Sequence, residues 1–548
     1  MLKERLICPL CSDAVDTLLF RFHIESERAV LQLIKEKNPG WAVNDGLCSR
    51  CVDYYQATVL MQQLILPEIG PYFPVKSVDD FVILPTPIRL NTDPRYTGKA
   101  VTICFIDSGF QLHPDLVASQ NRVKIHVDIT QSPNAIPFND DVKATGACWH
   151  GTMTTVVCAG DGCKSNGLYR GIASGAELVL LKVQDEGGRI TTENITKALQ
   201  WVLDHHECYN IKIVNMSVAD DEAISYKNST VDKLAEQLVT IGITVVAAVG
   251  NDETGSIKPP ANSPHVIAVG GINDNNDLEN GNPAAYHSTY GTTIDGLMKP
   301  ELVANSIWIA APILIGTEEK EKAELLHKLV KYSDEALQNA GNGVFRKAGI
   351  YYDGNEPMRL RDDVVQQIMA TKFFSPDYMH VDGTSFAAPI VCAVIAQLLE
   401  ANPLLTPKQI RQVLFSTAKQ LPGIQTIRQG FGYIQPRQAL LKVLNNEIIM
   451  KQQDSPFINH SNKTIEFYIH NSCAAKVSLA GTFNHWAQDV LLMEAGRDGL
   501  WKIEIPILEK GRYHYKFFID DKRWVEDVEN SLREHDGFNG WNSVLEII

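Results

Sequence analysis

The sequence predicts an α/β fold: a parallel sheet with helices on both faces, preceded by a small cysteine-bearing module and followed by a small antiparallel β-sandwich. Between residues 79 and 445, short apolar segments alternate with helical patterns, as in sheets covered by helices. The polar stretch 446–462 is typical of a linker, and from residue 463 to 548 short β-rich segments are separated by Gly, Asn and Asp. Two Cys-x-x-Cys pairs lie in residues 1–78. A chain of 548 residues accommodates roughly three such domains.

Apolar segments bounded by polar or turn-forming residues predict the strands of the parallel sheet. They are VTICFI (101–106), ELVLLKV (177–183), IKIVNMSV (211–218), ITVVAAV (243–249) and HVIAVG (265–270). Helical patterns occupy 192–206 and 231–241. The apolar residues that follow Ser385 have the spacing of a buried helical face, and Ser385 itself is in a position to cap that helix.

The bulk composition excludes several classes of protein. The formal charge of −15 argues against non-specific nucleic-acid binding, which needs a basic face. No apolar run reaches the ~20 residues that cross a bilayer, and the charged, cysteine-interrupted start does not have the apolar core of a signal peptide. Eleven cysteines without an export signal indicate reduced thiols or metal ligands, so we expect a cytoplasmic protein without membrane or nucleic-acid partners.

Four polar residues stand at the ends of predicted elements in the middle domain. Asp107 follows the first strand, His150 begins HGTMTTVVCAG, Asn251 ends VVAAVGN, and Ser385 opens the apolar helix. The carboxyl ends of parallel strands and the starts of the helices meet in one crevice, so these side chains can converge. Each alone has a plainer interpretation as a turn residue or helix cap. Together they supply a nucleophile, a base, a carboxylate that orients the base, and an amide for an oxyanion.

Residues 82–440 resemble the subtilisin-like serine proteases (subtilases). The resemblance rests on FIDSGFQLHPDL, HGT, GLYRGIASGAELVLLKV, IVNMSV, VVAAVGN, PPANSPHVIAVGG, KPELVA and DGTSFAAP, and on the chain order Asp, His, Ser. It implies that Asp107 orients His150, that His150 is the base and acid, that Ser385 attacks, and that Asn251 stabilises the oxyanion. It also implies that Ser217 borders the substrate-binding groove.

The chain departs from the family pattern in at least three places. After HGT it reads Met153-Thr154-Thr155 instead of His-Val-Ala, and Asp220 and Asp221 follow NMSVA where the family has small residues beside its specificity pocket. The third departure is an insertion at about 310–378, part of which has helical periodicity with a charged face. That part is either a solvated surface helix or a lid over the cleft.

The N-terminal cysteine pairs have the spacing of a structural zinc site. Cys8, Cys11, Cys48 and Cys51 form two Cys-x-x-Cys knuckles, and four thiolates at such spacing suit one tetrahedral ion. A redox pair or chance spacing are the alternatives. We expect the seven remaining cysteines to be buried thiols. Asp140-Asp141 and Asp274–Asp277 are candidate calcium ligands, but no acidic cluster requires that ion.

Residues from about 463 to the end resemble the glycogen-binding module of AMP-activated kinase β subunits and starch-branching enzymes. The match runs through GTFNHW, GRYHYKF and a following tryptophan. It implies that Trp486 and Trp524 stack on glucose rings, and that Lys516 and Asn542 bind sugar hydroxyls. The alternative is that both tryptophans are core residues of the sandwich.

These observations predict a serine endopeptidase that hydrolyses peptide bonds through an acyl-enzyme and is targeted or regulated by α-glucan. Two alternatives remain. One is a signalling or defence effector protease that stays silent until a regulatory protein partner binds, and the other is an inactive glucan-binding scaffold. Four catalytic-type residues argue against the scaffold.

Overall fold

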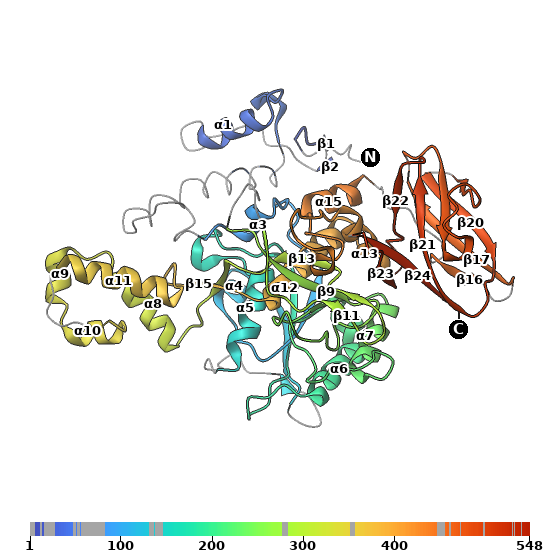
Figure 1. Ribbon diagram of the computed structural model, residues 1–548. Helices are drawn as coiled ribbons and strands as arrows, with labels where there is room; N and C mark the ends of the chain where they lie inside the picture. The colour runs from blue at the N-terminus through green and yellow to red at the C-terminus, as the bar shows by residue number, and fades with distance from the viewer. Residues whose placement is uncertain are drawn as a thin grey trace.

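The fold was analysed in a computed structural model of the chain (Figure 1). The structure describes residues 6–10, 14–15, 28–47, 51, 55, 83–130, 136–137, 146–276, 283–350, 357–445, 455–459, 462–471, 473–496, 499–528, 530, 532–538 and 540–547. Cys11, Cys48, Asp140, Asp141, Asp277 and most of the predicted linker lie outside these residues.

A predominantly parallel sheet forms the centre of the middle domain, as predicted. Its strands run in the order β10-β9-β8-β7-β3-β6-β4-β5, and β13 pairs with β9 in parallel. The bounds are β3 Thr102–Asp107, β4 Val123–Asp128, β5 Ile136–Pro137, β6 Glu177–Lys182, β7 Ile211–Met216, β8 Thr244–Ala248, β9 Ile267–Asn273, β10 Ala284–Ala285 and β13 Leu302–Asn305. The five predicted strands correspond to β3, β6, β7, β8 and β9. The sequence analysis missed β4, in which polar and apolar residues are mixed.

Helices cover both faces of this sheet, and two separate apolar clusters result. Along β3, Ile103 and Phe105 belong to the cluster formed with α5, α12, α13 and α15, whereas Cys104 and Ile106 belong to the cluster formed with α6 and α7. This alternation follows from the two-residue period of a strand. The helices are α3 Thr86–Arg89, α4 Pro114–Val117, α5 Cys148–Ala159, α6 Thr192–Tyr209, α7 Thr230–Thr240, α12 Thr384–Ala401, α13 Pro407–Thr417, α14 Thr426–Gln429 and α15 Pro436–Leu444.

Helix α12 is deeply buried in the middle domain. It contacts α5, β7, β8, β9 and α15. Among the described residues it is the one helix that is long and apolar enough to cross a membrane, and 83% of it is buried inside the protein. Helices in the core of a folded domain can be as long and as apolar as helices that cross a membrane.

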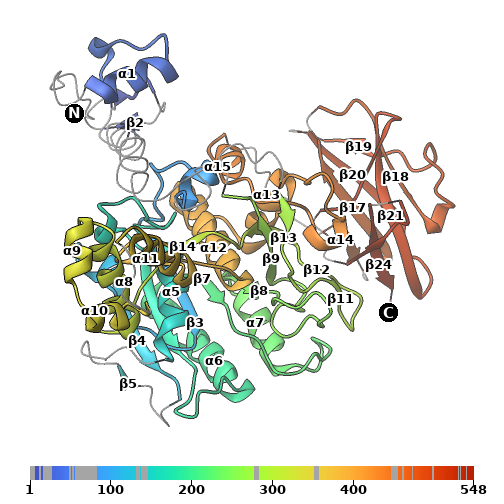
Figure 2. The same ribbon diagram turned by 60° about the vertical axis from the view of Figure 1, so that its left-hand side comes forward.

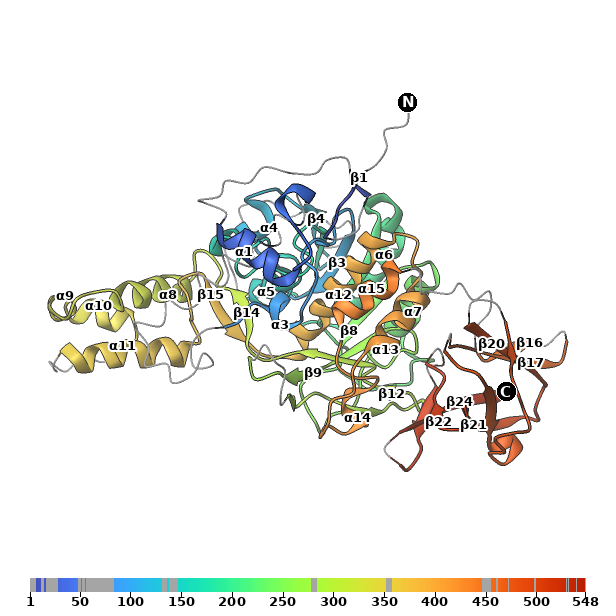
Figure 3. The same ribbon diagram turned by 90° about the horizontal axis from the view of Figure 1, so that it is seen from above.

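The insertion forms four helices with an apolar core of their own. They are α8 Glu318–Leu329, α9 Asp334–Asn339, α10 Asn342–Lys347 and α11 Pro357–Thr371, and the short strands β14 Ile309–Pro312 and β15 Tyr378–Val381 connect them to the main domain. Leu326, Leu337, Phe345 and Val364 lie in their common core. The helices project from one side of the sheet domain, opposite the C-terminal sandwich (Figure 3). The charged segment is therefore part of a packed subdomain and not a lone surface helix.

The C-terminal region is an antiparallel sandwich of two sheets, as predicted. One sheet has the order β16-β17-β20-β19, and the other has the order β18-β21-β24-β23 with β22 paired to β21. Figure 2 shows strands of both sheets, among them β17 and β20 of the first and β21 and β24 of the second. The strands are β16 Phe457–Asn459, β17 Thr464–His470, β18 Val477–Gly481, β19 Glu494–Ala495, β20 Leu500–Pro506, β21 Gly511–Ile519, β22 Arg523–Val525, β23 Arg533–His535 and β24 Trp541–Ile547. The apolar core between the sheets contains Phe467, Leu479, Trp501 and Phe517.

The described part of the N-terminal module is a hairpin and a helix. Strands β1 Leu6–Ile7 and β2 Ala14–Val15 pair in antiparallel fashion, and α1 spans Arg28–Lys37. Cys8 and Cys51 are buried beside Ile34 and Trp41, and their Sγ atoms are 3.9 Å apart.

The expectation that all seven remaining cysteines are buried needs correction. Cys104, Cys148, Cys158 and Cys392 are buried, but Cys208 and Cys473 are exposed and Cys163 is half-buried, because these three lie at a helix end or in turns.

Asp274 pairs with an arginine, so its carboxylate is not positioned as an open calcium ligand. Its two oxygens accept hydrogen bonds from Arg89 at 2.7 and 2.6 Å, and one also accepts from Asn305. Both members of the pair are completely buried.

Candidate active site

The candidate site lies where the strand order of the sheet reverses. Strand β3 is the first strand of this sheet along the chain. Strands β6 and β4 lie on one side of β3, and β7, β8 and β9 lie on its other side. Ligand sites of open α/β sheets are found at such a switch point, beyond the carboxyl ends of the strands. Asp107 is the last residue of β3 and therefore stands at this point.

Asp107 and His150 form a close, oriented pair. His150 lies in the first turn of α5, and its Nδ1 is 2.6 Å from Oδ1 of the completely buried Asp107. The close approach of α5 to the turn after β3 depends on Gly151, since a Cβ there would lie 2.3 Å from the carbonyl oxygen of Gly109. The hydrogen bond at Nδ1 leaves Nε2 as the nitrogen that can accept a proton.

The surroundings of His150 favour its protonated form. Burial lowers the pKa of the imidazole, but the negative charge of Asp107 and the hydrogen bond to it outweigh that effect, and the pKa is raised above its ordinary value. The side chain is 39% exposed, and its ring centre is 6.1 Å from that of Phe386, the residue after Ser385. His150 therefore stands beside the start of α12 with an accessible edge.

Ser385 is the second residue of α12, and not its cap as one interpretation of the sequence proposed. The N-cap is Gly383, whose φ of 141° is in the region that favours glycine. Pro389, four residues later, has no N–H to donate to the Ser385 carbonyl. That carbonyl instead accepts a hydrogen bond of 2.9 Å from the hydroxyl of Ser217. The Ser217 side chain thus contacts the nucleophile's backbone, which the sequence analysis did not predict.

The carboxamide of Asn251 is held beside the same turn. Its Oδ1 accepts hydrogen bonds of 2.9 Å from both the backbone N–H and the hydroxyl of Thr384. This fixes the orientation of the amide and leaves Nδ2 as a donor next to Gly383, 3.6 Å from where a Cβ on that glycine would lie. A fixed donor next to a nucleophile is the arrangement that stabilises an oxyanion.

Thr154 is a contributor that the sequence analysis noted only as a departure from the family pattern. Its hydroxyl lies 3.0 Å from Asp107 Oδ2, and the backbone N–H of Ser108 donates to Oδ1 at 2.7 Å. Thr154 is one helical turn after His150, on the side of α5 that faces β3. The spacing of four residues places Thr154 on the same face of α5 as His150, but it carries no signal for a contact with β3.

The two acidic residues that replace small residues of the family lie in different environments. Asp220 is buried, and its carboxylate accepts hydrogen bonds from the Thr192 hydroxyl and the Asp221 backbone. Asp221 is exposed. Of the two, Asp221 is therefore the residue whose carboxylate is accessible to a positively charged group from solvent.

The insertion forms a wall beside the base. A cavity of about 620 Å³ lies between α5, β15 and the insertion, and Trp149, Met153, Phe373, Met379 and Val381 supply its apolar lining. Trp149 directly precedes His150, and Val381 is four residues before Ser385. The insertion thus borders the crevice on the histidine side.

Strand register places the predicted sugar-binding residues on one face of the sandwich. Tyr515 pairs with Ser543 and Phe518 with Trp524, so Lys516, Trp524 and Asn542 project from the same face. The rings of Trp486 and Trp524 are 5.8 Å apart and nearly perpendicular.

Trp486 is half-buried and Trp524 is 37% exposed, so neither is a core residue of the sandwich. Lys516 donates to Asp536 at 2.6 Å. The turn held by Asp536 also presents Phe538, which is 91% exposed and was not singled out from the sequence.

Comparison with known proteins gives two family matches. The subtilase family matches residues 98–433, and the glycogen recognition site of AMP-activated protein kinase matches residues 466–547.

Among curated proteins, serine protease AprX of Bacillus subtilis (strain 168) is 26% identical over 58% of this chain and 61% of its own. Subtilisin E of the same organism is 30% identical over 33% of this chain and 43% of its own length. Among solved structures, sphericase has a TM-score of 0.42 at 21% identity, over 62% of this chain and 92% of its own. The chain thus spans less than two thirds of the length of either curated relative. Since the family match covers more than half of the chain, the protein belongs to the subtilase family.

Proposed function

We propose that this protein is a serine endopeptidase that forms an acyl-enzyme on Ser385. The observation that carries the proposal is the 2.6 Å hydrogen bond between Asp107 and His150, formed next to the start of α12. Membership of the subtilase family supports the same activity.

In this mechanism the Ser385 hydroxyl attacks the peptide carbonyl while Nε2 of His150 takes its proton. The negative charge that develops on the carbonyl oxygen is stabilised by Nδ2 of Asn251. His150, now positively charged, is stabilised by Asp107 and returns the proton to the leaving amine. Water then hydrolyses the acyl-enzyme with His150 again as the base.

We further propose that the sandwich binds α-glucan and thereby places the peptidase on glycogen-like polymers. The family match to a glycogen recognition site supports this, as do the two accessible tryptophans beside Lys516 and Asn542. Flat aromatic rings pack on the C–H face of a sugar, while polar groups bind its hydroxyls.

We also propose a structural zinc site in the N-terminal module. Zinc–sulfur bonds of about 2.3 Å in a tetrahedron place sulfurs about 3.8 Å apart. The 3.9 Å between Cys8 and Cys51, which are 43 residues apart in sequence, is compatible with that geometry. Cys11 and Cys48 would complete the ligand set, and the ion would stabilise a module too small for a large core.

A fluorophosphonate probe tests the peptidase directly. We expect labelling of Ser385, located by mass spectrometry of the modified peptide, because an activated serine reacts where an ordinary one does not. The reaction should be lost in His150→Ala and retained in the matched His206→Ala, which changes a histidine on α6. No labelling, with or without glycogen, would instead favour the inactive scaffold.

Thr154→Val isolates the contact between α5 and Asp107. Loss of a hydrogen bond to a buried charge weakens such a site by about 1.5–3 kcal/mol, so we expect kcat for a small peptide to fall about 10-fold or more. The acid limb of the pH profile should move to higher pH, because a less solvated Asp107 attracts the His150 proton more strongly. Thr155→Val is the control, since its hydroxyl bonds only the Gly151 carbonyl at 2.7 Å. Equal effects of both variants would show that Thr154 has only a structural role.

The raised pKa of His150 predicts the pH dependence of activity. The base must be neutral, so kcat/KM rises with pH through the His150 pKa, and the midpoint should lie above the ordinary value of about 6.5. Asp107→Asn removes the attraction that raises the pKa and leaves the opposing effect of burial. Its midpoint should therefore lie lower, with kcat reduced about 10⁴-fold. A wild-type midpoint below 6 would contradict this electrostatic assignment.

Trp486→Ala tests the sugar-binding proposal. We expect weaker retention on glycogen, since the indole surface that stacks on a sugar ring is lost, together with unchanged cleavage of small peptides. Trp201→Ala on α6 is the matched control, because it removes a half-buried tryptophan outside the sandwich. Equal retention of wild type and Trp486→Ala would refute a role for this tryptophan in glycogen binding.

Metal analysis tests the zinc proposal without reference to activity. The purified full chain should contain about one zinc per molecule, the number that four thiolates hold. Cys51→Ser should lower this content, whereas Cys208→Ser, at an exposed position of α6, should not. A metal-free wild type, or equal zinc in both variants, would exclude the site.

A further inference from the structure

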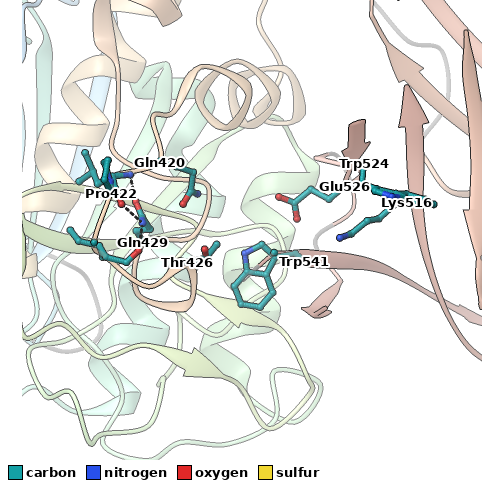
Figure 4. Close-up of a pocket in the computed structure, with 12 residues that line it drawn as sticks. Gln420, Pro422, Thr426, Gln429, Lys516, Trp524, Glu526 and Trp541 are labelled. Carbon is teal, nitrogen blue, oxygen red and sulfur yellow. Dashed lines mark hydrogen bonds between the residues drawn. The ribbon is translucent and has the colours of Figure 1, made fainter. Parts of the chain in front are cut away.

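A cavity lies between the sandwich and the protease domain, on the side where the predicted sugar-binding face ends. Its volume is about 520 Å³, within the range of small-molecule sites. Figure 4 shows protease side chains on one side and sandwich side chains on the other. Its lining includes Gln420 and Pro422 of the protease domain and Lys516, Trp524, Glu526 and Trp541 of the sandwich.

Two polar groups of the cavity lining have no hydrogen-bond partner among the residues that the structure describes. One is the indole N–H of Trp541, a side chain that is only 3% exposed. The other is Oε2 of Glu526, whose charged neighbour is Nη1 of Arg533 at 3.7 Å, beyond hydrogen-bond distance. Burial costs free energy for a donor or an acceptor that remains unpaired. A ligand that offers both an acceptor and a donor would satisfy this pair.

The two walls of the cavity are held together by a buried arginine of the sandwich. The guanidinium of Arg533 stacks over Phe431 of the protease domain at 3.9 Å and over Trp541 at 5.1 Å. It is 2% exposed and lies 3.7 Å from Glu526. Val528 packs against the core of the protease domain. The cavity is therefore bounded by a packed interface between the domains.

The lining points to a carbohydrate. Lys516 and Trp524 belong both to this cavity and to the predicted glucan face, so the two surfaces are continuous. Sugar hydroxyls act as donor and acceptor at once, which matches the unpaired Trp541 N–H and the Glu526 carboxylate. On the protease side, Gln420 and Pro422 are exposed next to this surface.

We propose that the protease segment 420–429 completes the glucan site, so that an α-linked glucose oligomer is held jointly by both domains. This rests on the proposed glucan binding and deepens it. The sandwich supplies the stacking surface of Trp524, the N–H of Trp541 and the acceptor of Glu526. The protease domain supplies the opposite wall, which a sandwich by itself would not have.

Calorimetric titration of the full chain with maltoheptaose tests the composite site. Pro422→Trp fills the cavity from the protease side and should weaken binding about 10-fold or more, as expected when a buried contact surface is lost. Leu404→Trp is the matched control, because it adds the same indole at a position that is 86% exposed and outside the cavity. Trp541→Phe keeps the ring against Arg533 but removes the N–H, and should weaken binding about fivefold. An unchanged circular dichroism spectrum and thermal unfolding curve verify that each variant is folded.

The outcomes separate this inference from the glucan proposal on which it rests. Weaker binding by Pro422→Trp and Trp541→Phe, with Leu404→Trp unaffected, supports the composite site. If Trp524→Ala abolishes binding while Pro422→Trp and Trp541→Phe bind as tightly as wild type, glucan binding stands and the composite site is wrong. If the wild type does not bind maltoheptaose, both proposals fail.

Discussion

The first turn of the buried helix α12 is the constraint on which the candidate active site depends. Pro389 leaves the Ser385 carbonyl without its helical hydrogen bond, and Ser217 supplies the missing donor from the end of β7. Asn251, after β8, accepts from the N–H of Thr384 in the same turn. Residues that follow two neighbouring strands thus hold the backbone of Ser385, and the deep burial of α12 keeps this turn in place relative to the sheet.

The other half of the site depends on a close approach between backbones. Gly151 allows α5 to pack directly on the turn after β3, and this brings His150 to Asp107. Thr154 then adds a second contact from the same helix to the carboxylate. The carboxylate is completely buried, so its hydrogen bonds replace water and determine how strongly it attracts the histidine proton.

The additions to the subtilase domain border it on opposite sides (Figure 3). The four-helix insertion forms a wall next to His150, whereas the sandwich meets the protease domain at α14 and the segment before it. Arg428 of α14 forms an ion pair with Glu253, two residues after Asn251, and donates to the carbonyl of Tyr286 at 2.9 Å. One short helix therefore contacts both the domain interface and the loop that carries Asn251.

The sequence by itself determined the class of fold, the positions of the five main strands, and the residue types of the site. These are local properties: strand periodicity and the turn chemistry around Asp107, His150, Asn251 and Ser385 are visible in short stretches of the chain. It could not predict the contact from Thr154 to Asp107 or from Ser217 to Ser385. Those contacts depend on how distant elements pack, which periodicity does not encode.

The tertiary structure also decided which tryptophans of the sandwich are accessible and where the predicted sugar-binding face points. Trp486 and Trp524 occur in the same kind of short β-rich stretch as the buried Trp501 and Trp541. Strand register assigns each to a face, and the interface around Arg533 turns one face toward the protease domain. Register and domain packing arise from contacts between residues far apart in sequence, so only the folded chain reveals them.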